Sequence, residues 1–272
     1  MLPSPRIALL NLPACLCLAF LGLGSPAQSS KQTIPLKTQD MLQRQISWDE
    51  NSPSEKNPNG LYFQFSKTDE TTSSGKRVVL YRAYVFGAPE NKKYTLTVWK
   101  IGSDPHTLPG EVYINAKGLL MKKKPNQEQE NSDFVGDDEL QLAVQAARAE
   151  PVRYALTSSN KEILVYGTVV PFPSEDIDRD CRLEVRLAQP DATAVLVYAD
   201  GLPANTVVPF QMLSDDKPET GKFSVNAQGH AVETGILPTG VKEIGTLKVT
   251  LSSTECSVAV EIPWGEGSYH PL

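Results

Sequence analysis

A pattern of glycine, proline and asparagine occurs twice in this chain and constrains its fold more than any other feature. The first copy runs from Gly87 to Gly118 and the second from Gly201 to Gly229. Each copy begins Gly-x-Pro, continues through an apolar strand and a polar turn, and ends in a short strand with Asn-Ala-x-Gly. The copies are offset by 114 residues at their first glycine and by 111 at their last. A repeat of this period predicts two consecutive domains of one kind.

Proline (21 residues) and glycine (18 residues) interrupt the chain at short intervals, which favours many short strands over long helices. The chain has 272 residues, of which 40% are apolar, so it is long enough for two domains with cores of their own. We therefore predict an all-β fold of two consecutive antiparallel β-sandwich domains.

Polar and proline-containing segments set the predicted boundaries. Residues 28–58 lack an apolar period and are predicted to be a leader or linker, although Ile46 and Trp48 could pack on the first domain as an edge segment. The remaining predicted parts are a first domain over 59–173, an acidic linker over 174–180 and a second domain over 181–272.

The first copy is longer than the second because it carries an insertion over residues 119–150. A helix is predicted within it at about 137–149, because acidic residues begin that stretch, Ala, Leu and Gln fill it, and Pro151 follows it. We attribute the acidic residues Asp133, Asp137, Asp138 and Glu139 to capping of this helix.

The N-terminus has the pattern of a secretory signal peptide. Arg6 precedes an almost unbroken apolar run over Ile7–Leu23, and Ser25–Ala27 places small residues before a predicted cleavage after Ala27. The alternatives are an uncleaved membrane anchor and a lipid anchor at Cys15. Residues 1–27 are thus predicted to be removed, leaving a secreted or periplasmic protein that has no later apolar run of membrane-spanning length.

Charge and cysteine content restrict the partners and cofactors. Without Arg6 the chain has 25 basic and 32 acidic residues, so we expect no binding to nucleic acid. The mature chain keeps Cys181 and Cys256, which in an oxidising compartment are predicted to form a disulfide, with two separate buried thiols as the alternative. Zinc-ligand spacing is absent from the sequence, and no cofactor is predicted.

Several motifs resemble tandem immunoglobulin-like β-sandwich modules of bacterial secreted proteins. The motifs are GLPANT (201–206), FSVNAQGH (223–230), the late Cys256 and VEIPWG (260–265). The resemblance covers about 180–272 well and 78–171 more loosely, because the insertion departs from it. It implies the immunoglobulin-like sandwich and roles in binding, spacing or structure, and it assigns no catalytic residue.

The predicted acidic linker offers one metal candidate. Asp176, Asp178 and Asp180 place carboxylates at alternate positions, as a calcium site between two domains could. Glycine and glutamate are missing from the positions that an EF-hand loop requires, where Cys181 and Leu187 stand instead. A solvated acidic linker is the favoured interpretation.

Signs of catalysis are weak. The chain has three histidines, His106, His230 and His270, and no Gly-x-Ser-x-Gly elbow accompanies them. We therefore expect no catalytic residue and no enzyme.

Two sets of residues are candidates for binding. The aromatic side chains of Tyr84, Tyr94 and Trp99 could form an interface, although strand aromatics more often belong to a core. The basic loop Lys122, Lys123 and Lys124 lies in the insertion, which one repeat has and the other lacks, and insertions of this kind often carry the binding site.

The leading hypothesis is an exported, non-catalytic interaction or scaffold protein of the cell envelope, periplasm or extracellular space, with a protein or glycan as its partner. The alternative is a carbohydrate-binding accessory or hydrolytic enzyme that uses aromatic and acidic residues of the first domain.

Overall fold

The structure is a computed structural model that describes residues 36–52, 60–90, 92–122, 138–161, 164–215, 217–237, 244–254, 256–265 and 272. The predicted signal peptide, Lys123, Lys124, Asp133, Asp137 and His270 lie outside the described residues. In the described ranges no helix has the length and apolar character needed to cross a membrane.

The described chain is mostly β, as predicted, with one helix. The elements are α1 (Leu36–Glu50), β1 (Tyr62–Ser73), β2 (Lys76–Phe86), β3 (Tyr94–Lys100), β4 (His106–Thr107), β5 (Val112–Ile114), β6 (Leu120–Lys122), β7 (Asp138–Glu139), β8 (Gln141–Val144), β9 (Val152–Ser158), β10 (Leu164–Val169), β11 (Ser174–Asp178), β12 (Cys181–Leu187), β13 (Ala194–Asp200), β14 (Val207–Ser214), β15 (Lys217–Ser224), β16 (Ala231–Ile236), β17 (Gly245–Ser252) and β18 (Ser257–Trp264).

The first sandwich is built from two antiparallel sheets. One sheet has the strand order β1-β2-β8, and the other has the order β10-β9-β3-β5-β6-β7 with β4 paired to β3. Apolar residues at alternate positions of these strands bury one side of each sheet, as the period of two in a strand requires. Its core contains Val79, Val85, Leu96, Ile114, Leu120 and Leu156.

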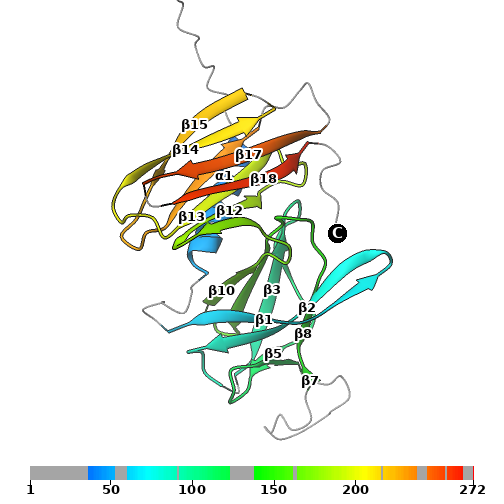
Figure 1. The fold of residues 1–272 in the computed structure, drawn as a ribbon. Helices are drawn as coiled ribbons and strands as arrows, with labels where there is room; N and C mark the ends of the chain where they lie inside the picture. Colours follow the sequence, from blue (N-terminus) through cyan, green and yellow to red (C-terminus); the bar gives the residue numbers. More distant parts are fainter. Residues whose placement is uncertain are drawn as a thin grey trace, which may run out of the picture. The chain divides into compact units, whose positions relative to one another are not determined.

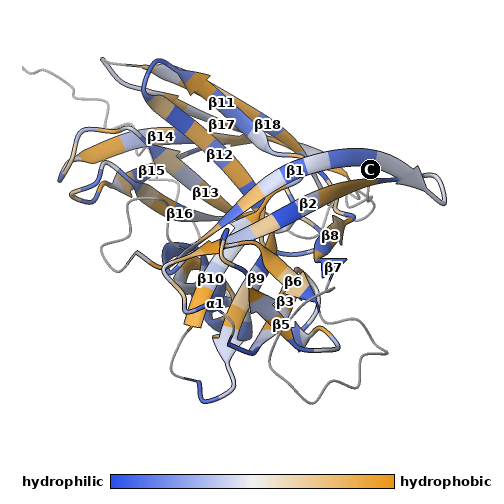
Figure 2. Cartoon of the chain, turned by 90° about the horizontal axis from the view of Figure 1, so that it is seen from below, coloured by the Kyte–Doolittle hydropathy of each residue, from blue (hydrophilic) through white to orange (hydrophobic). Residues whose placement is uncertain are grey.

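The second sandwich is more regular. Its sheets have the orders β11-β12-β13-β16 and β15-β14-β17-β18, and Figure 1 shows the second of these as one layer. Hydrophobic and hydrophilic residues alternate along β17 and β18, and Figure 2 shows the resulting bands of colour. The predicted disulfide is confirmed: Cys181 at the start of β12 is bonded to Cys256 just before β18.

The two copies of the repeat have the same register. Tyr62 lies opposite Phe86 in the β1–β2 pair, one residue before Gly87, and Arg182 lies opposite Asp200 in the β12–β13 pair, one residue before Gly201. The repeat is therefore structural, with β1 and β2 equivalent to β12 and β13.

The two repeat glycines are needed for the same reason. Gly87 has φ +77° and Gly201 has φ +72°, conformations that L side chains rarely adopt. A Cβ on Gly87 would lie 2.1 Å from the carbonyl oxygen of Gly60, and one on Gly201 would lie 1.8 Å from that of Asp180. Each glycine thus lets its own backbone pass close to the residue that leads into the neighbouring strand.

The Asn-Ala-x-Gly turns are also identical in their hydrogen bonds. The Oδ1 of Asn115 accepts from the backbone N–H groups of Lys117 and Leu119, at 2.9 and 3.0 Å. The Oδ1 of Asn226 accepts from those of Gln228 and His230, at the same two distances. Asparagine is therefore required in each copy because its side chain takes the place of a backbone acceptor.

The prediction of a helix at about 137–149 is wrong. The described part of that stretch contains β7 and β8, and β8 pairs with β2 as an edge strand of the first sandwich. Leu142 and Val144 are buried while Gln141 and Ala143 are exposed, which is a period of two. Burial of that alternating face against the core outweighs the helix propensity of the Ala/Leu/Gln sequence.

The one described helix, α1, lies in the segment predicted to be a leader. Leu42 of α1 is buried and packs on the outer face of the sheet that contains β13, against Leu196 and Tyr198. Ile46 packs in the same cluster, whereas Trp48 contacts the first sandwich. Helix α1 is therefore an integral part of the fold, and it contacts both sandwiches.

The predicted linker over 174–180 is also wrong, because β11 occupies most of it. β11 pairs antiparallel with β12 from Ser174 opposite Val185 to Asp178 opposite Cys181. The sequence signal was the alternation of side chains in Ser-Glu-Asp-Ile-Asp, which its acidic composition obscured.

Candidate functional site

A buried carboxylate at the end of α1 connects the two sandwiches. Asp49 accepts two hydrogen bonds from Arg153 of β9, each 2.8 Å long, and one of 2.8 Å from Thr168 of β10. From the second sandwich it accepts a hydrogen bond of 2.6 Å from the hydroxyl of Tyr198, and Nη1 of Arg186 lies 3.4 Å away. Four strands of two domains therefore meet at this carboxylate.

The charge of Asp49 is stabilised although its side chain is almost fully buried. Burial alone would raise the pKa of this carboxyl, but the Arg153 guanidinium, Arg186 and the Tyr198 hydroxyl together hold the pKa below its ordinary value of 3.8. Burial next to Asp49 also raises the pKa of Tyr198 well above its ordinary value. At neutral pH the cluster thus contains an ionised aspartate and a neutral tyrosine that donates to it.

The cluster continues along β12 to a second carboxylate. Arg186 donates two hydrogen bonds of 2.8 Å to Glu184, and its guanidinium lies 4.2 Å from the ring centroid of Tyr198. Arg182 contacts Glu184 at 3.0 Å and Glu175 of β11 at 2.6 Å. The side chain of Glu184 is only 2% exposed, whereas that of Arg182 is 40% exposed. The charged groups that reach solvent at this end of the cluster are therefore Arg182 and its partner Glu175, which is 29% exposed.

Aromatic rings pack on the other side of the Asp49 cluster, at the junction between the two sandwiches. Trp48 of α1 packs edge-on against Trp99 of β3 and Tyr166 of β10, at centroid distances of 5.4 and 4.8 Å. The guanidinium of Arg153 lies 5.5 Å from the Trp99 ring centroid. These contacts exclude water from the Asp49 ion pair and keep it strong.

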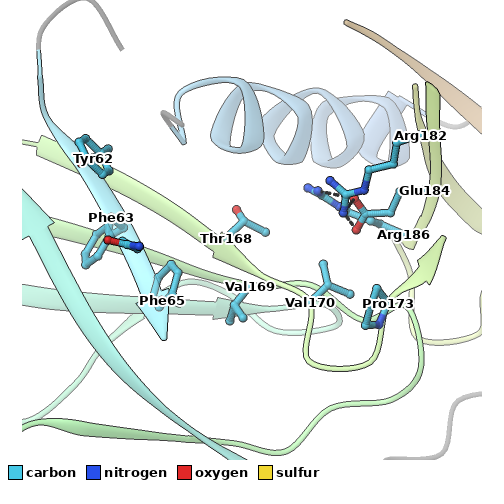
Figure 3. A pocket seen from close by; sticks show the side chains of 11 residues that line it. Tyr62, Phe63, Phe65, Thr168, Val169, Val170, Pro173, Arg182, Glu184 and Arg186 are labelled. Carbon is cyan, nitrogen blue, oxygen red and sulfur yellow. Dashed lines mark hydrogen bonds and ion pairs between the residues drawn. The ribbon is translucent and has the colours of Figure 1, made fainter. Parts of the chain in front are cut away.

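A groove opens between the sandwiches beside this cluster. It has a cavity volume of about 440 Å³, and its lining comes from β1, β10, the segment after β10 and β12. Figure 3 shows Tyr62, Phe63 and Phe65 on one side of it and Arg182, Glu184 and Arg186 on the other, with Thr168, Val169 and Val170 between them. An aromatic wall thus faces a wall of ion-paired charged side chains.

The predicted aromatic site does not assemble. Tyr94 is 1% exposed and its hydroxyl donates to the Pro89 carbonyl at 2.7 Å, and Trp99 is 4% exposed in the junction. Both belong to the core, so their proposed role as surface contacts is wrong. Tyr84 is half-buried on the other face of β2, where its ring stacks 6.4 Å from that of Phe86.

The predicted basic loop is described only at Lys122, which ends β6 opposite Asp138 of β7 and is exposed. Lys122 lies on a different sheet from Tyr84, and it does not line the groove. Of the predicted binding residues that the structure describes, Tyr84 and Lys122 therefore stay apart at the surface and Tyr94 and Trp99 are buried.

The candidate calcium ligands have other partners. Asp176 accepts a hydrogen bond of 2.8 Å from the backbone N–H of Ala259, and Asp178 accepts one of 3.0 Å from that of Ser257, both in β18. These two carboxylates therefore accept hydrogen bonds from backbone N–H groups at the edge of the opposite sheet. The third candidate, Asp180, has its backbone carbonyl next to Gly201. Across the part of the chain that the structure describes, no group of three or more His, Cys, Asp or Glu side chains is placed to hold a metal ion.

The histidines are in separate places. His106 is exposed in β4, and Nδ1 of His230 lies 2.7 Å from Oδ1 of Asp200 at the end of β13. Burial would raise the pKa of Asp200, but His230 and the nearby arginines Arg182 and Arg186 lower it. The His230–Asp200 pair ties the turn before β16 to β13.

Sequence reasoning missed the junction entirely. Asp49 lies in a polar segment, Arg153 is the single basic residue of an apolar strand, and Arg186 alternates with Arg182 and Glu184 along β12. A basic residue in a strand that is otherwise buried on both faces, as in β9, was the one available signal, because such a charge needs a buried partner.

Comparisons with protein-family models and with curated proteins found no match. Among solved structures the chain is similar to a tetra-tandem repeat in the extending region of a large adhesion protein, with 10% sequence identity and a TM-score of 0.25. The match covers 76% of this chain and spans about half, 50%, of that longer chain. A likeness at this level carries no functional argument.

Proposed function

We propose that this chain is an exported, non-catalytic interaction or scaffold protein of the cell envelope, periplasm or extracellular space, and that its partner binds in the groove between the two sandwiches. The observation that carries the proposal is the groove itself, which residues of both domains line beside a buried ion pair. A site formed by two domains needs their relative position to be held, and the Asp49 cluster supplies that restraint.

The physical character of the groove supports binding of a partner polypeptide. Tyr62 and Phe65 provide partly exposed aromatic surface beside the buried Phe63, and Arg182, 40% exposed and ion-paired with Glu175 and Glu184, provides a polar contact. Aromatic residues and arginine are the residue types enriched at interface hot spots. The alternative based on Tyr84, Tyr94 and Trp99 loses its support, because two of these three side chains are buried.

The test is affinity capture from envelope and secreted fractions of the source cells with the full chain as bait. Val170→Trp would fill the groove, and Leu164→Trp is the matched control, because Leu164 is 45% exposed on β10 and does not line the groove. We expect a specific partner that Val170→Trp loses and Leu164→Trp retains. Equal capture by all three proteins would contradict the groove as the site, and capture of nothing would contradict the interaction function.

Export is tested separately. Mass spectrometry of the protein recovered from cell fractions should give a mature N-terminus at Gln28 in the secreted or periplasmic fraction. An intact N-terminus in the cytoplasmic fraction would contradict export.

A further inference from the structure

The two sandwiches differ at one edge, and the shared register shows where. Because β1 is equivalent to β12, Tyr62 and Phe63 correspond to Arg182 and Leu183. In the same way β10 corresponds to β18, since Leu156 lies opposite Val165 in the first sandwich and Leu251 lies opposite Val258 in the second. The edge between β1 and β10 is therefore the counterpart of the edge between β12 and β18.

In the second sandwich a strand fills this edge. β11 pairs with β12 over Cys181–Val185, and Asp176 and Asp178 of β11 bind the backbone N–H groups of Ala259 and Ser257 in β18. One strand thus adds to the first sheet by a backbone ladder and closes against the second sheet with carboxylates. Pro263 lies an even number of residues after Ser257 and Ala259 in β18, so it faces the same edge. As a proline it has no backbone N–H that needs an acceptor.

In the first sandwich the corresponding position is the groove. The sheet order places β1 at the end of its sheet and β10 at the end of the other, among the strands that the structure describes. The groove is lined by Tyr62–Phe65 and Thr168–Val170 of these two edges. Tyr62–Phe65 are the equivalents of Arg182–Val185, which are residues that β11 covers in the second sandwich.

We propose that the groove is a strand-addition site, which takes an extended segment of a partner polypeptide with carboxylates at alternate positions. An edge strand presents unpaired N–H and C=O groups that a further strand can pair with, and peptide recognition by strand addition uses this geometry. This inference rests on the proposed function, because it specifies the partner that the groove binds.

The preference for carboxylates comes from two observations. The strand that fills the equivalent edge uses Asp176 and Asp178 to reach the neighbouring sheet and Glu175 to reach Arg182. The edge of β10 is the counterpart of the edge of β18, so its backbone N–H groups can take carboxylates as those of Ser257 and Ala259 do. Hydrogen bonds between backbone N–H and carboxylate are among the stronger ones in proteins.

The experiment uses the full chain and a labelled peptide with the sequence of residues 173–180, Pro-Ser-Glu-Asp-Ile-Asp-Arg-Asp. The control peptide carries Glu175→Gln, Asp176→Asn and Asp178→Asn, which keep shape and remove charge. Fluorescence anisotropy measures binding of both. We expect saturable binding of the acidic peptide and at least about tenfold weaker binding of the control, since a charge-assisted hydrogen bond is about twice as strong as a neutral one.

The location is tested by substitution and by hydrogen exchange. Val170→Trp should abolish peptide binding, and Val207→Trp should leave it unchanged because Val207 is a 63% exposed residue of β14 outside the groove, with unfolding curves to show that both variants are folded. The peptide should slow exchange of the backbone amides of Tyr62–Phe65. Slowed exchange at Cys181–Val185 instead would mean that the peptide replaces β11, and it would overturn the proposal. Slow exchange of the Tyr62–Phe65 amides in the absence of peptide would also overturn the proposal, because the edge of β1 would then already be paired within the chain.

The outcome for the peptide and the outcome for capture are separable. A captured partner that Val170→Trp loses, together with no binding of the acidic peptide, would overturn strand addition and leave the proposed function standing. Equal binding of the acidic and neutral peptides would overturn the preference for carboxylates.

Discussion

Arg153 of β9 and Asp49 of α1 form a bidentate ion pair in which both hydrogen bonds are 2.8 Å long and the two side chains are 1% and 2% exposed. The residues are 104 positions apart in the sequence. Because Asp49 also accepts a hydrogen bond from Tyr198 in the other sandwich, this pair is one point at which the helix and both sandwiches are joined. A buried charge without its partner is costly, so each member depends on the others.

Replacing Asp49 with asparagine should destabilise the protein strongly. The substitution leaves Arg153 buried without a counter-ion and weakens the contact to Arg186, so we expect the free energy of unfolding to fall by about 3–5 kcal/mol. Denaturant unfolding measures it. Asp40→Asn is the matched control, because Asp40 is an exposed residue of the same helix and its loss should change stability by less than about 0.5 kcal/mol. Similar losses in both variants would contradict a special role for Asp49.

The contribution of Asp49 should also depend on pH. Its pKa in the folded protein lies below the ordinary value of 3.8, so the unfolded chain takes up the proton first as the pH falls. The stability that Asp49 contributes is therefore fully present above about pH 4 and is lost as the pH falls through the lower, folded-state value. We expect the stability difference between wild type and Asp49→Asn to be constant from pH 7 to 5 and to shrink below pH 4. A difference that does not change over that range would contradict the ionised state of Asp49.

Reduction of the disulfide should destabilise the second sandwich. The bond between Cys181 and Cys256 closes a loop with a sequence separation of 75, for which loop-closure entropy gives about 4 kcal/mol. Denaturant unfolding with and without dithiothreitol measures this. The double variant Cys181→Ser, Cys256→Ser is the control. It should have the stability of the reduced wild type whether or not dithiothreitol is present. A wild-type midpoint that reductant does not change would contradict the prediction.

Alanine at a repeat glycine should be poorly tolerated. Gly201→Ala combines a left-handed backbone with a clash against the carbonyl of Asp180, and we expect a loss of about 2 kcal/mol or more in the free energy of unfolding. Gly75→Ala separates the two effects. Gly75 has φ +78° but no atom within 4 Å of the added Cβ, so its loss should be about 1 kcal/mol. Equal losses would mean that the backbone angle alone matters and the close approach does not.

The sequence predicted those features that repeat or alternate locally. The two Gly-x-Pro and Asn-Ala-x-Gly motifs correctly predicted the same local geometry at two places in the chain, since Gly201 has a left-handed backbone and Asn226 closes a turn on residues two and four positions later. Cys181 and Cys256 were correctly paired because they are the only cysteines outside the N-terminal segment.

The errors in secondary structure have one cause. In β8, the composition favours a helix, but Leu142 and Val144 are buried on one face of a sheet that residues far away complete. In α1, the polar composition concealed a helix whose buried contacts, such as Leu42 against Leu196, lie on another domain. Local propensity differs by less than about 1 kcal/mol per residue, so burial against distant partners overrides it.

The sequence by itself determined the β class, the duplication and the disulfide, because these depend on local backbone requirements and on a count of cysteines. Tertiary structure alone decided the junction and the groove. Asp49, Arg153 and Tyr198 have no common pattern in the sequence, and they acquire a shared role only when two sandwiches and a helix exclude water around one carboxylate. In a medium of low polarity that carboxylate needs all its partners, so the fold that buries it also fixes the groove beside it.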